Sequence, residues 1–262
     1  MEAAEAGTMT VLIEACVDAI DAALDADQGG AGRLELCGEL LQGGVTPSAG
    51  LIGAVWEQVN IPVFVLIRPR MGDFLYTDDE CDVMLRDIAL ARSLDVDGVV
   101  FGALTTNGDI DVGTVSQLVD AAGPLEVTFH RAFDFVRDQN VALQALIELG
   151  VDRVLTSGGA ATALEGAGQL ARLVEQASGE IRIVAGGSIT ADNVSEVVRR
   201  SGVHEVHVRG AARVESEMSY RVNRVTLARP HTIGDYDRMM TRADEIGRIA
   251  RAVGAVESAS LA

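Results

Sequence analysis

The sequence has 262 residues, 48% of them hydrophobic, and its 39 acidic and 21 basic side chains leave a net charge of −18. All the basic residues are arginine, which excludes a Schiff-base lysine, and with it PLP or imine-forming aldolase chemistry, and also a P-loop lysine. The negative field disfavours nucleic-acid binding and is typical of an acidic, halophile-like surface in a salt-adapted cell.

The chain shows no signal for a membrane or for export. No run of 18 or more apolar residues is present, and the first residues are acidic and rich in alanine, so we expect neither a membrane span nor a secretory signal. Three cysteines without a pairing pattern indicate reduced thiols in a cytoplasmic protein. We expect a disordered acidic N-terminus over 1–9, one folded domain over 10–256 and a tail over 257–262.

Segments with strand character alternate with amphipathic helical segments. The expected strands are Val11–Ala15, Arg33–Cys37, Val63–Ile67, Gly98–Phe101, Glu126–Phe129, Arg153–Thr156, Ile181–Ala185 and Glu205–Val208. The expected helices are Asp18–Gln28, Ser48–Val59, Asp78–Leu94, Val112–Ala121, Gln139–Leu149, Ala161–Gln176, Ala191–Arg200 and Tyr236–Val253. Eight βα units in about 250 residues predict an α/β fold, a single-domain TIM (β/α)8 barrel.

Two connections refine this prediction. No GxGxxG motif follows the first strand, which argues against an open dinucleotide-binding sheet and against a nucleotide cofactor. The longest irregular connection runs from Gly210 to Gly234, and a structureless loop of that length is expected to act as a lid or to bind a partner.

Polar side chains collect where the expected strands end. Alternate residues of a strand face opposite sides, and the sites of α/β barrels lie at the C-terminal ends of the strands. One face of these ends carries Glu14, Cys16, Glu35, Cys37, Arg68, Arg70, His130, His207 and Arg209. The opposite face is mostly apolar and suited to packing under helices, so we expect the polar set inside the barrel mouth.

Soft-metal binding is one chemistry that this set could support. Thiolates and imidazoles suit Cu(I) or Zn(II), so Cys16 and Cys37 could bind such an ion, with His130 and His207 as additional ligands. The simpler alternative is that each cysteine is a small buried hydrophobic residue. Cys81, on the third helix, is assigned to packing.

Acid–base catalysis is the second chemistry. Glu14 and Glu35 lie on neighbouring strands beside Arg68 and could transfer protons with His130 as partner. An equally simple interpretation is an ion-pair network that plugs the barrel, in which Arg68 and Arg70 neutralise the two glutamates.

Anion binding is the third. The glycine turns after strands seven and eight lie where TIM barrels bind phosphate through backbone N–H groups, and the turn after strand six adds donors. The candidate anion or ligand-binding residues are Arg68, Arg70, Asp73, Thr156, Ser157, Gly186, Gly187, His207 and Arg209. Glycine is also needed simply to turn the chain.

Several longer motifs resemble one known family. They are Glu35-Leu36-Cys37, GGVTPS over 43–48, IRPRMGDFLY over 67–76, TFHRAFD over 128–134, LTSG over 155–158 and AGG over 185–187. Together they resemble the CutC family, named for copper homeostasis, over about residues 11–223. The resemblance implies a cytoplasmic TIM barrel linked to copper, often a homodimer or higher homo-oligomer, with Cys16 and Cys37 as copper ligands. Arg209 and residues 39–42 depart from the family pattern.

These observations leave two main hypotheses. The first is a CutC-type barrel that binds copper, as Cu(I), at its mouth through Cys16 and Cys37. The second is a lyase- or isomerase-type enzyme for a small anionic or phosphorylated metabolite, because arginines at the mouth would repel a metal ion but hold an anion. A scaffold without chemistry is disfavoured, since burying charged groups costs stability.

Overall fold

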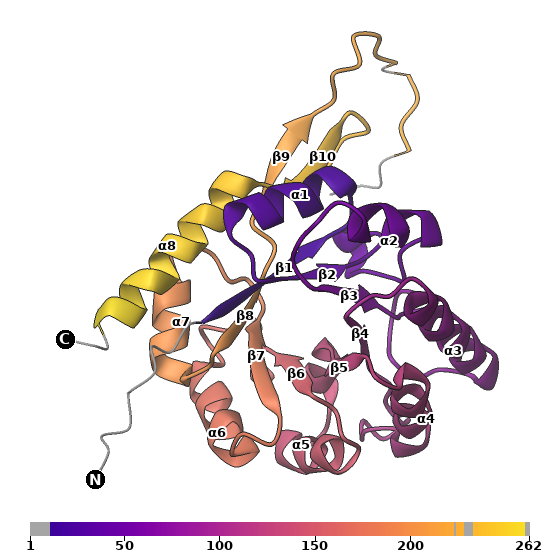
Figure 1. Ribbon diagram of the computed structural model, residues 1–262, viewed down its shortest axis with the longest axis vertical. Coiled ribbons are helices and arrows are strands. Elements are labelled where there is room, and N and C mark those ends of the chain that lie inside the picture. Colours follow the sequence, from indigo (N-terminus) through magenta and orange to yellow (C-terminus); the bar gives the residue numbers. More distant parts are fainter. Residues whose placement is uncertain (1–10, 223, 228–232, 260–262) are drawn as a thin grey trace.

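Eight parallel strands close into a barrel. The computed structural model describes residues 11–222, 224–227 and 233–259 (Figure 1). The barrel strands are β1 (Leu12–Val17), β2 (Arg33–Leu36), β3 (Val63–Leu66), β4 (Gly98–Phe101), β5 (Glu126–Phe129), β6 (Arg153–Thr156), β7 (Arg182–Gly186) and β8 (Glu205–Val208). Each strand pairs with its neighbours along the chain, and β1 also pairs with β8, which closes the barrel. The predicted TIM barrel is confirmed.

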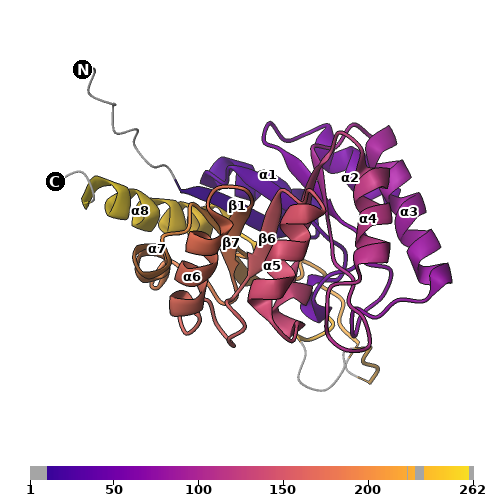
Figure 2. The ribbon, with the colours of Figure 1, turned by 90° about the horizontal axis from the view of Figure 1, so that it is seen from below.

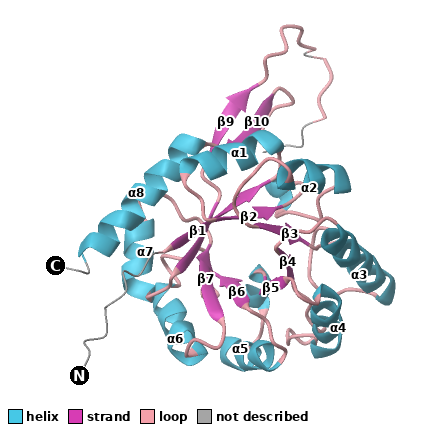
Figure 3. Ribbon diagram, viewed as in Figure 1, coloured by secondary structure: helices cyan, strands magenta, loops and turns pink. Residues whose placement is uncertain are grey.

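Helices form a ring outside the strands (Figure 3). They are α1 (Ile20–Gly29), α2 (Ala49–Trp56), α3 (Asp78–Ser93), α4 (Val112–Ala122), α5 (Gln139–Glu148), α6 (Ala167–Ala177), α7 (Val194–Ser201) and α8 (Ala243–Ala259), with short 3-10 turns η1 (Leu40–Gln42) and η2 (Arg131–Phe135). The start of α3 shows how local sequence sets such a boundary. The Thr77 hydroxyl accepts from the Glu80 N–H, and the Glu80 carboxylate accepts from the Thr77 N–H, which satisfies two donors that a helix start leaves free.

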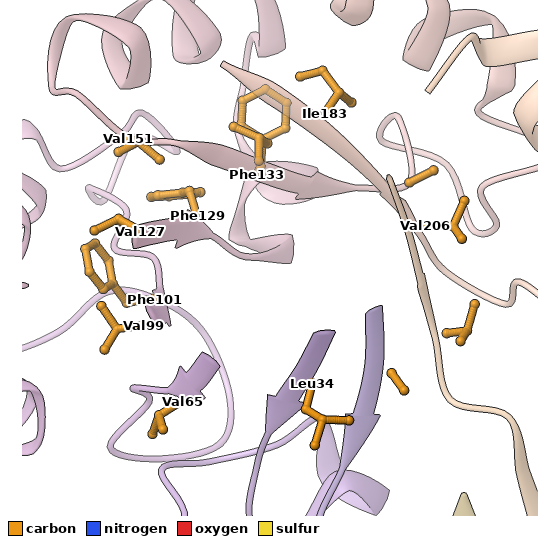
Figure 4. Packing of buried hydrophobic residues seen from close by; sticks show 14 of the residues in the cluster. Leu34, Val65, Val99, Phe101, Val127, Phe129, Phe133, Val151, Ile183 and Val206 are labelled. Carbon is orange, nitrogen blue, oxygen red and sulfur yellow. The ribbon is translucent and has the colours of Figure 1, made fainter. Parts of the chain in front are cut away.

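The main hydrophobic core lies between the strands and the helices. Phe101, Phe129 and Phe133 are completely buried there and pack with valines of neighbouring strands such as Val99 and Val127 (Figure 4). Burying one such ring contributes about 1.5–3 kcal/mol relative to leaving it exposed. Because the strand residues among them use the outward-facing side of each strand, the alternate residues are left to fill the barrel interior.

The segment after β8 differs from its prediction. Strand β9 (Ala211–Glu215) pairs antiparallel with β10 (Asp237–Thr241), and this arm projects beyond the ring of helices (Figure 1). The expectation of a structureless loop from Gly210 is therefore wrong at β9, and the helix expected from Tyr236 begins only at Ala243. Five-residue strands carry little periodicity, so a partner more than twenty residues away decides their structure.

The structure describes the C-terminal helix but not the extreme ends of the chain. The N-terminal segment expected over 1–9 and the last residues of the expected tail, 260–262, lie outside the described residues. Helix α8 packs alongside α1 and α7, where Figure 2 shows it at one side of the barrel. Across the described part of the chain, no helix has the length and apolar character needed to cross a membrane.

Candidate functional site

An ion-pair network fills the bottom of the barrel. Arg33 donates to Glu14 Oε2 and to Glu205 Oε2, each at 2.5 Å, and Arg153 Nε lies 3.3 Å from Glu205 Oε2. The Phe64 ring lies beside both guanidinium groups, with its centroid 5.0 Å from Arg33 Cζ and 5.1 Å from Arg153 Cζ. All five side chains are buried, so the network forms a polar plug that links strands β1, β2, β6 and β8.

Above the plug, one histidine bridges two glutamates. His207 Nδ1 lies 2.7 Å from Glu14 Oε1, and its Nε2 lies 3.5 Å from Glu35 Oε2. Among the described residues, these three offer ligand atoms that all lie within 4.8 Å of one another. The arrangement can therefore share a proton or, with two carboxylates and an imidazole, coordinate a cation.

Glu14 and Glu35 are both buried, but their pKa values shift in opposite directions. Burial alone would raise the pKa of Glu14, but Arg33 and His207 outweigh it and hold that pKa at about 2. Burial raises the pKa of Glu35 to about 7 despite the opposing charge of His207. Burial would lower the pKa of His207, yet electrostatic interactions with Cys16 and Glu35, and hydrogen bonds to Cys16 and Glu14, raise it well above its usual value. His207 is thus held in its protonated form, while Glu35 can gain or lose a proton near neutral pH.

The two predicted thiols lie next to this cluster. Cys16 is opposite Glu35 in the β1–β2 register, and the Cys37 N–H donates to Val17 O at 2.9 Å, so the cysteines are diagonal neighbours on the inner face. Both are free and buried, with exposures of 7% and 1%. Burial raises the pKa of Cys37 well above its usual value, and negative charge on Glu35 and Cys16 raises it further.

Arg68 enters the mouth from the end of β3. Its Nη1 donates to Gly43 O at 3.2 Å and Gly44 O at 2.8 Å, and its Nη2 donates to Gly72 O at 2.7 Å. Its Cζ lies 5.0 Å from the centroid of the Phe74 ring. Carbonyl oxygens and an aromatic face therefore hold the guanidinium, and none of the carboxylates in the described residues forms a salt bridge with it.

His130 ends β5 beside the same aromatic ring. Its Nδ1 accepts from the Ala132 N–H at 3.2 Å, and its ring centroid lies 4.9 Å from that of Phe74. Burial and the charge of Arg68 lower the pKa of His130 to about 3, so the ring is neutral. Gly102 on the neighbouring strand end makes room for it, because a Cβ there would lie 2.7 Å from the imidazole.

Comparison with known proteins identifies the family. A family model described as the CutC family matches residues 11–212. The mouse protein named copper homeostasis protein cutC homolog is 46% identical over 235 residues, which covers 90% of this chain and 86% of the mouse protein. This chain belongs to the CutC family. The human protein of the same name is 45% identical over the same shares of the two chains.

Solved structures agree with this assignment. A crystal structure described as CutC from Streptococcus agalactiae is 36% identical, covers 76% of this chain and 98% of that one, and superposes with a TM-score of 0.73. A thiamine phosphate pyrophosphorylase from Pyrococcus furiosus has 16% identity and a TM-score of 0.57, covering 95% of this chain and 98% of that one. The second likeness shows the barrel fold alone. The family resemblance inferred from the motifs is confirmed.

The alternation of side chains along the strands predicted the positions of some residues at the barrel mouth correctly and of others incorrectly. Glu14 and Glu35 meet inside the barrel as expected, but the imidazole that contacts both is His207 and not His130. Arg70 lies outside the barrel, where its guanidinium pairs with Glu80 at 2.5 Å and with Asp73 at 3.1 Å. Strand β3 ends at Leu66, so alternation no longer governs residue 70.

The arginines of the plug also differ from the expected ones. The network predicted between Glu14, Glu35, Arg68 and Arg70 is not formed. Instead, Arg33 pairs with Glu14 and Glu205, Arg153 pairs with Glu205, and Glu35 lies beside His207. The signal for Arg33 was present in the sequence, because it shares strand parity with Glu35. Arg33, Arg153 and Glu205 each begin a strand, so the polar pattern at the C-terminal strand ends does not include them.

The hydrogen-bond donors after β6 that were expected to bind an anion donate instead to a carboxylate of the chain itself. The Thr156 hydroxyl donates to Asp134 at 2.5 Å, and the N–H groups of Ser157 and Gly159 each donate to the same carboxylate at 3.0 Å. Arg131 Nε adds a further bond at 2.7 Å. These donors organise the chain itself, with Asp134 in the place where an anion would bind.

The remaining anion candidates have distinct surroundings. Gly186 is packed tightly, since a Cβ there would lie 2.5 Å from Leu155 Cδ1, and Gly187 has a φ of +113° that favours glycine. Arg209 follows β8, and its Nη2 is buried without a hydrogen-bond partner in the structure.

Proposed function

We propose that this CutC-family protein binds copper, as Cu(I), through Cys16 and Cys37 at the barrel mouth. The observation that carries the proposal is the placement of two free, buried thiols as diagonal neighbours on the inner face of adjacent strands. Relatives that are 45–46% identical carry copper homeostasis in their names.

The surroundings of the thiols favour a soft cation. Thiolate sulfur is a preferred ligand of Cu(I), and the carboxylates of Glu14 and Glu35 place negative charge beside the sulfurs. Burial, together with this negative charge, raises the pKa of the Cys37 thiol well above its usual value. Cu(I) must therefore displace the thiol proton and should bind more tightly as pH rises. A thiolate site needs reduced cysteines, which favours the cytoplasm as its compartment.

An anaerobic Cu(I) competition titration against a coloured chelator tests this function. We expect one Cu(I) per chain for the wild type and at least a hundredfold weaker binding for the Cys16→Ala/Cys37→Ala double variant. Cys81→Ala is the matched control, because this third free cysteine lies on α3, with its Sγ beside Thr114. Equal binding by the wild type and the double variant would refute the proposal.

A second candidate, an acid–base enzyme of the lyase or isomerase type, is favoured by one observation. Glu35 has a pKa raised to about 7 and lies 3.5 Å from His207, which suits proton abstraction near neutral pH. The test incubates the protein in D2O with a panel of small carboxylic acids and sugar phosphates and follows their C–H signals by NMR. Deuterium incorporation that Glu35→Gln abolishes supports the enzyme, and incorporation that is equal for both proteins contradicts it.

A further inference from the structure

Two buried N–H donors near the mouth have no acceptor within the part of the chain that the structure describes. Arg68 Nε and His130 Nε2 lack a hydrogen-bond partner there, and the two side chains are only 7% and 5% exposed. The hydroxyl of Tyr76, which lies near Arg68, is likewise buried without a partner at hydrogen-bond distance. A buried donor left unsatisfied costs about 1–3 kcal/mol, so native proteins rarely keep two of them together without a use.

The charge of Arg68 is also uncompensated. Its two terminal nitrogens donate to three carbonyl oxygens, which orient the guanidinium without neutralising it. Within the ranges that the structure describes, its positive charge meets no carboxylate at salt-bridge distance. A buried cation of this kind favours a bound anion, because pairing recovers part of the solvation that burial removes.

His130 contributes a neutral N–H donor, Nε2, to the region beside Arg68. Its Nδ1 accepts from the Ala132 N–H, so the ring proton resides on Nε2. Arg68 and His130 both contact the Phe74 ring, at 5.0 Å and 4.9 Å from its centroid, and the charge of Arg68 is felt by the imidazole. The two donors therefore belong to one region, between the ends of β3 and β5.

We infer that Arg68 Nε and His130 Nε2 together bind one small oxyanion, a carboxylate or a phosphate group, against the Phe74 ring. One N–H from each side chain can serve two oxygens of a single anionic group, since the other guanidinium nitrogens are already occupied. The proposal does not depend on copper, because the guanidinium repels metal cations. With a net charge of −18, the chain as a whole repels anions, so a saturable anion effect would require a dedicated site.

Thermal unfolding with added anions tests the site. The probes are sodium phosphate and sodium acetate, compared with sodium chloride at the same ionic strength. The proteins are the wild type, Arg68→Gln, His130→Asn and the control Arg70→Gln. Asparagine keeps an acceptor near the position of Nδ1 but lacks Nε2, and Arg70 loses the same charge outside the barrel, where it pairs with Glu80.

We expect phosphate or acetate to raise the unfolding midpoint saturably in the wild type and in Arg70→Gln. Half-saturation should require at least tenfold more anion in Arg68→Gln and His130→Asn. A response to phosphate alone identifies a phosphate group as the ligand, and a response to acetate alone identifies a carboxylate. If Arg68→Gln fails to fold, His130→Asn decides the matter.

The inference is overturned if neither anion exceeds chloride, or if His130→Asn responds as the wild type does. The Cu(I) titration repeated on His130→Asn separates the two proposals. Unchanged copper binding together with lost anion binding shows that they are independent sites, whereas a failed copper titration leaves the anion result standing.

Discussion

Replacing Glu35 with glutamine should stabilise the folded protein at pH 8, although it removes a buried charge that faces His207. Glutamine resembles the protonated carboxyl group in shape and is neutral at every pH. The pKa of Glu35 is about 7 in the folded protein against 4.5 in its unfolded reference, so folding disfavours the ionised side chain. At about 1.4 kcal/mol for each pH unit between these values, the penalty at pH 8 reaches about 3 kcal/mol.

The gain in stability from Glu35→Gln should be larger at high pH than at low pH. Above pH 7, Glu35 is ionised in both states and the full penalty applies, so the substitution has its largest effect there. As pH falls from 7 towards 4.5, the folded protein takes up the proton first and the penalty disappears. At pH 5 the advantage of Glu35→Gln should be below about 1 kcal/mol.

Glu14→Gln is the matched control, because it makes the same change on the neighbouring strand. The pKa of Glu14 lies at about 2, below its usual 4.5, so ionised Glu14 stabilises the fold at every pH above 4.5. This stabilisation is lost progressively as pH falls from about 4.5 to about 2. Glu14→Gln should therefore cost about 3 kcal/mol both at pH 8 and at pH 5.

Urea unfolding followed by circular dichroism at pH 8 and pH 5 measures both effects. The midpoint should rise for Glu35→Gln at pH 8 and fall for Glu14→Gln at both pH values, with unchanged slopes. If Glu35→Gln lowers the stability at pH 8 as much as Glu14→Gln does, the reasoning is refuted, because Glu35 would then be a stabilising partner of His207.

Two further substitutions probe the barrel interior. Arg33→Met should lower the free energy of unfolding by about 3–5 kcal/mol, since it leaves two buried glutamates without their shared cation, and a loss below 1 kcal/mol would show that the plug is not needed. Gly102→Ala should cost about 1–3 kcal/mol, because its methyl group would overlap the His130 ring. Gly53→Ala on α2 is the control and should gain about 0.5–1 kcal/mol, as nothing lies within 4 Å of the added Cβ; equal effects at the two glycines would contradict the packing argument. Chemical denaturation measures all three.

The amino-acid sequence was sufficient for the barrel and for part of its mouth. Strand and helix periodicities repeat eight times along the chain, and this local pattern is what a (β/α)8 barrel requires. Within a strand the alternation of side chains is rigid, so the inward positions of Glu14, Cys16, Glu35 and Cys37 followed from parity alone.

Tertiary structure decided which partners these groups have. Arg70 lies beyond the end of β3 and pairs with Glu80. Asp134 accepts the hydrogen bonds of the donors after β6. Strand β10 pairs with β9 instead of extending α8. Each outcome depends on groups that meet only after the barrel closes. Periodicity reports the direction of a side chain within its own element, whereas charge pairing and pKa values depend on distances between elements, which no local pattern contains.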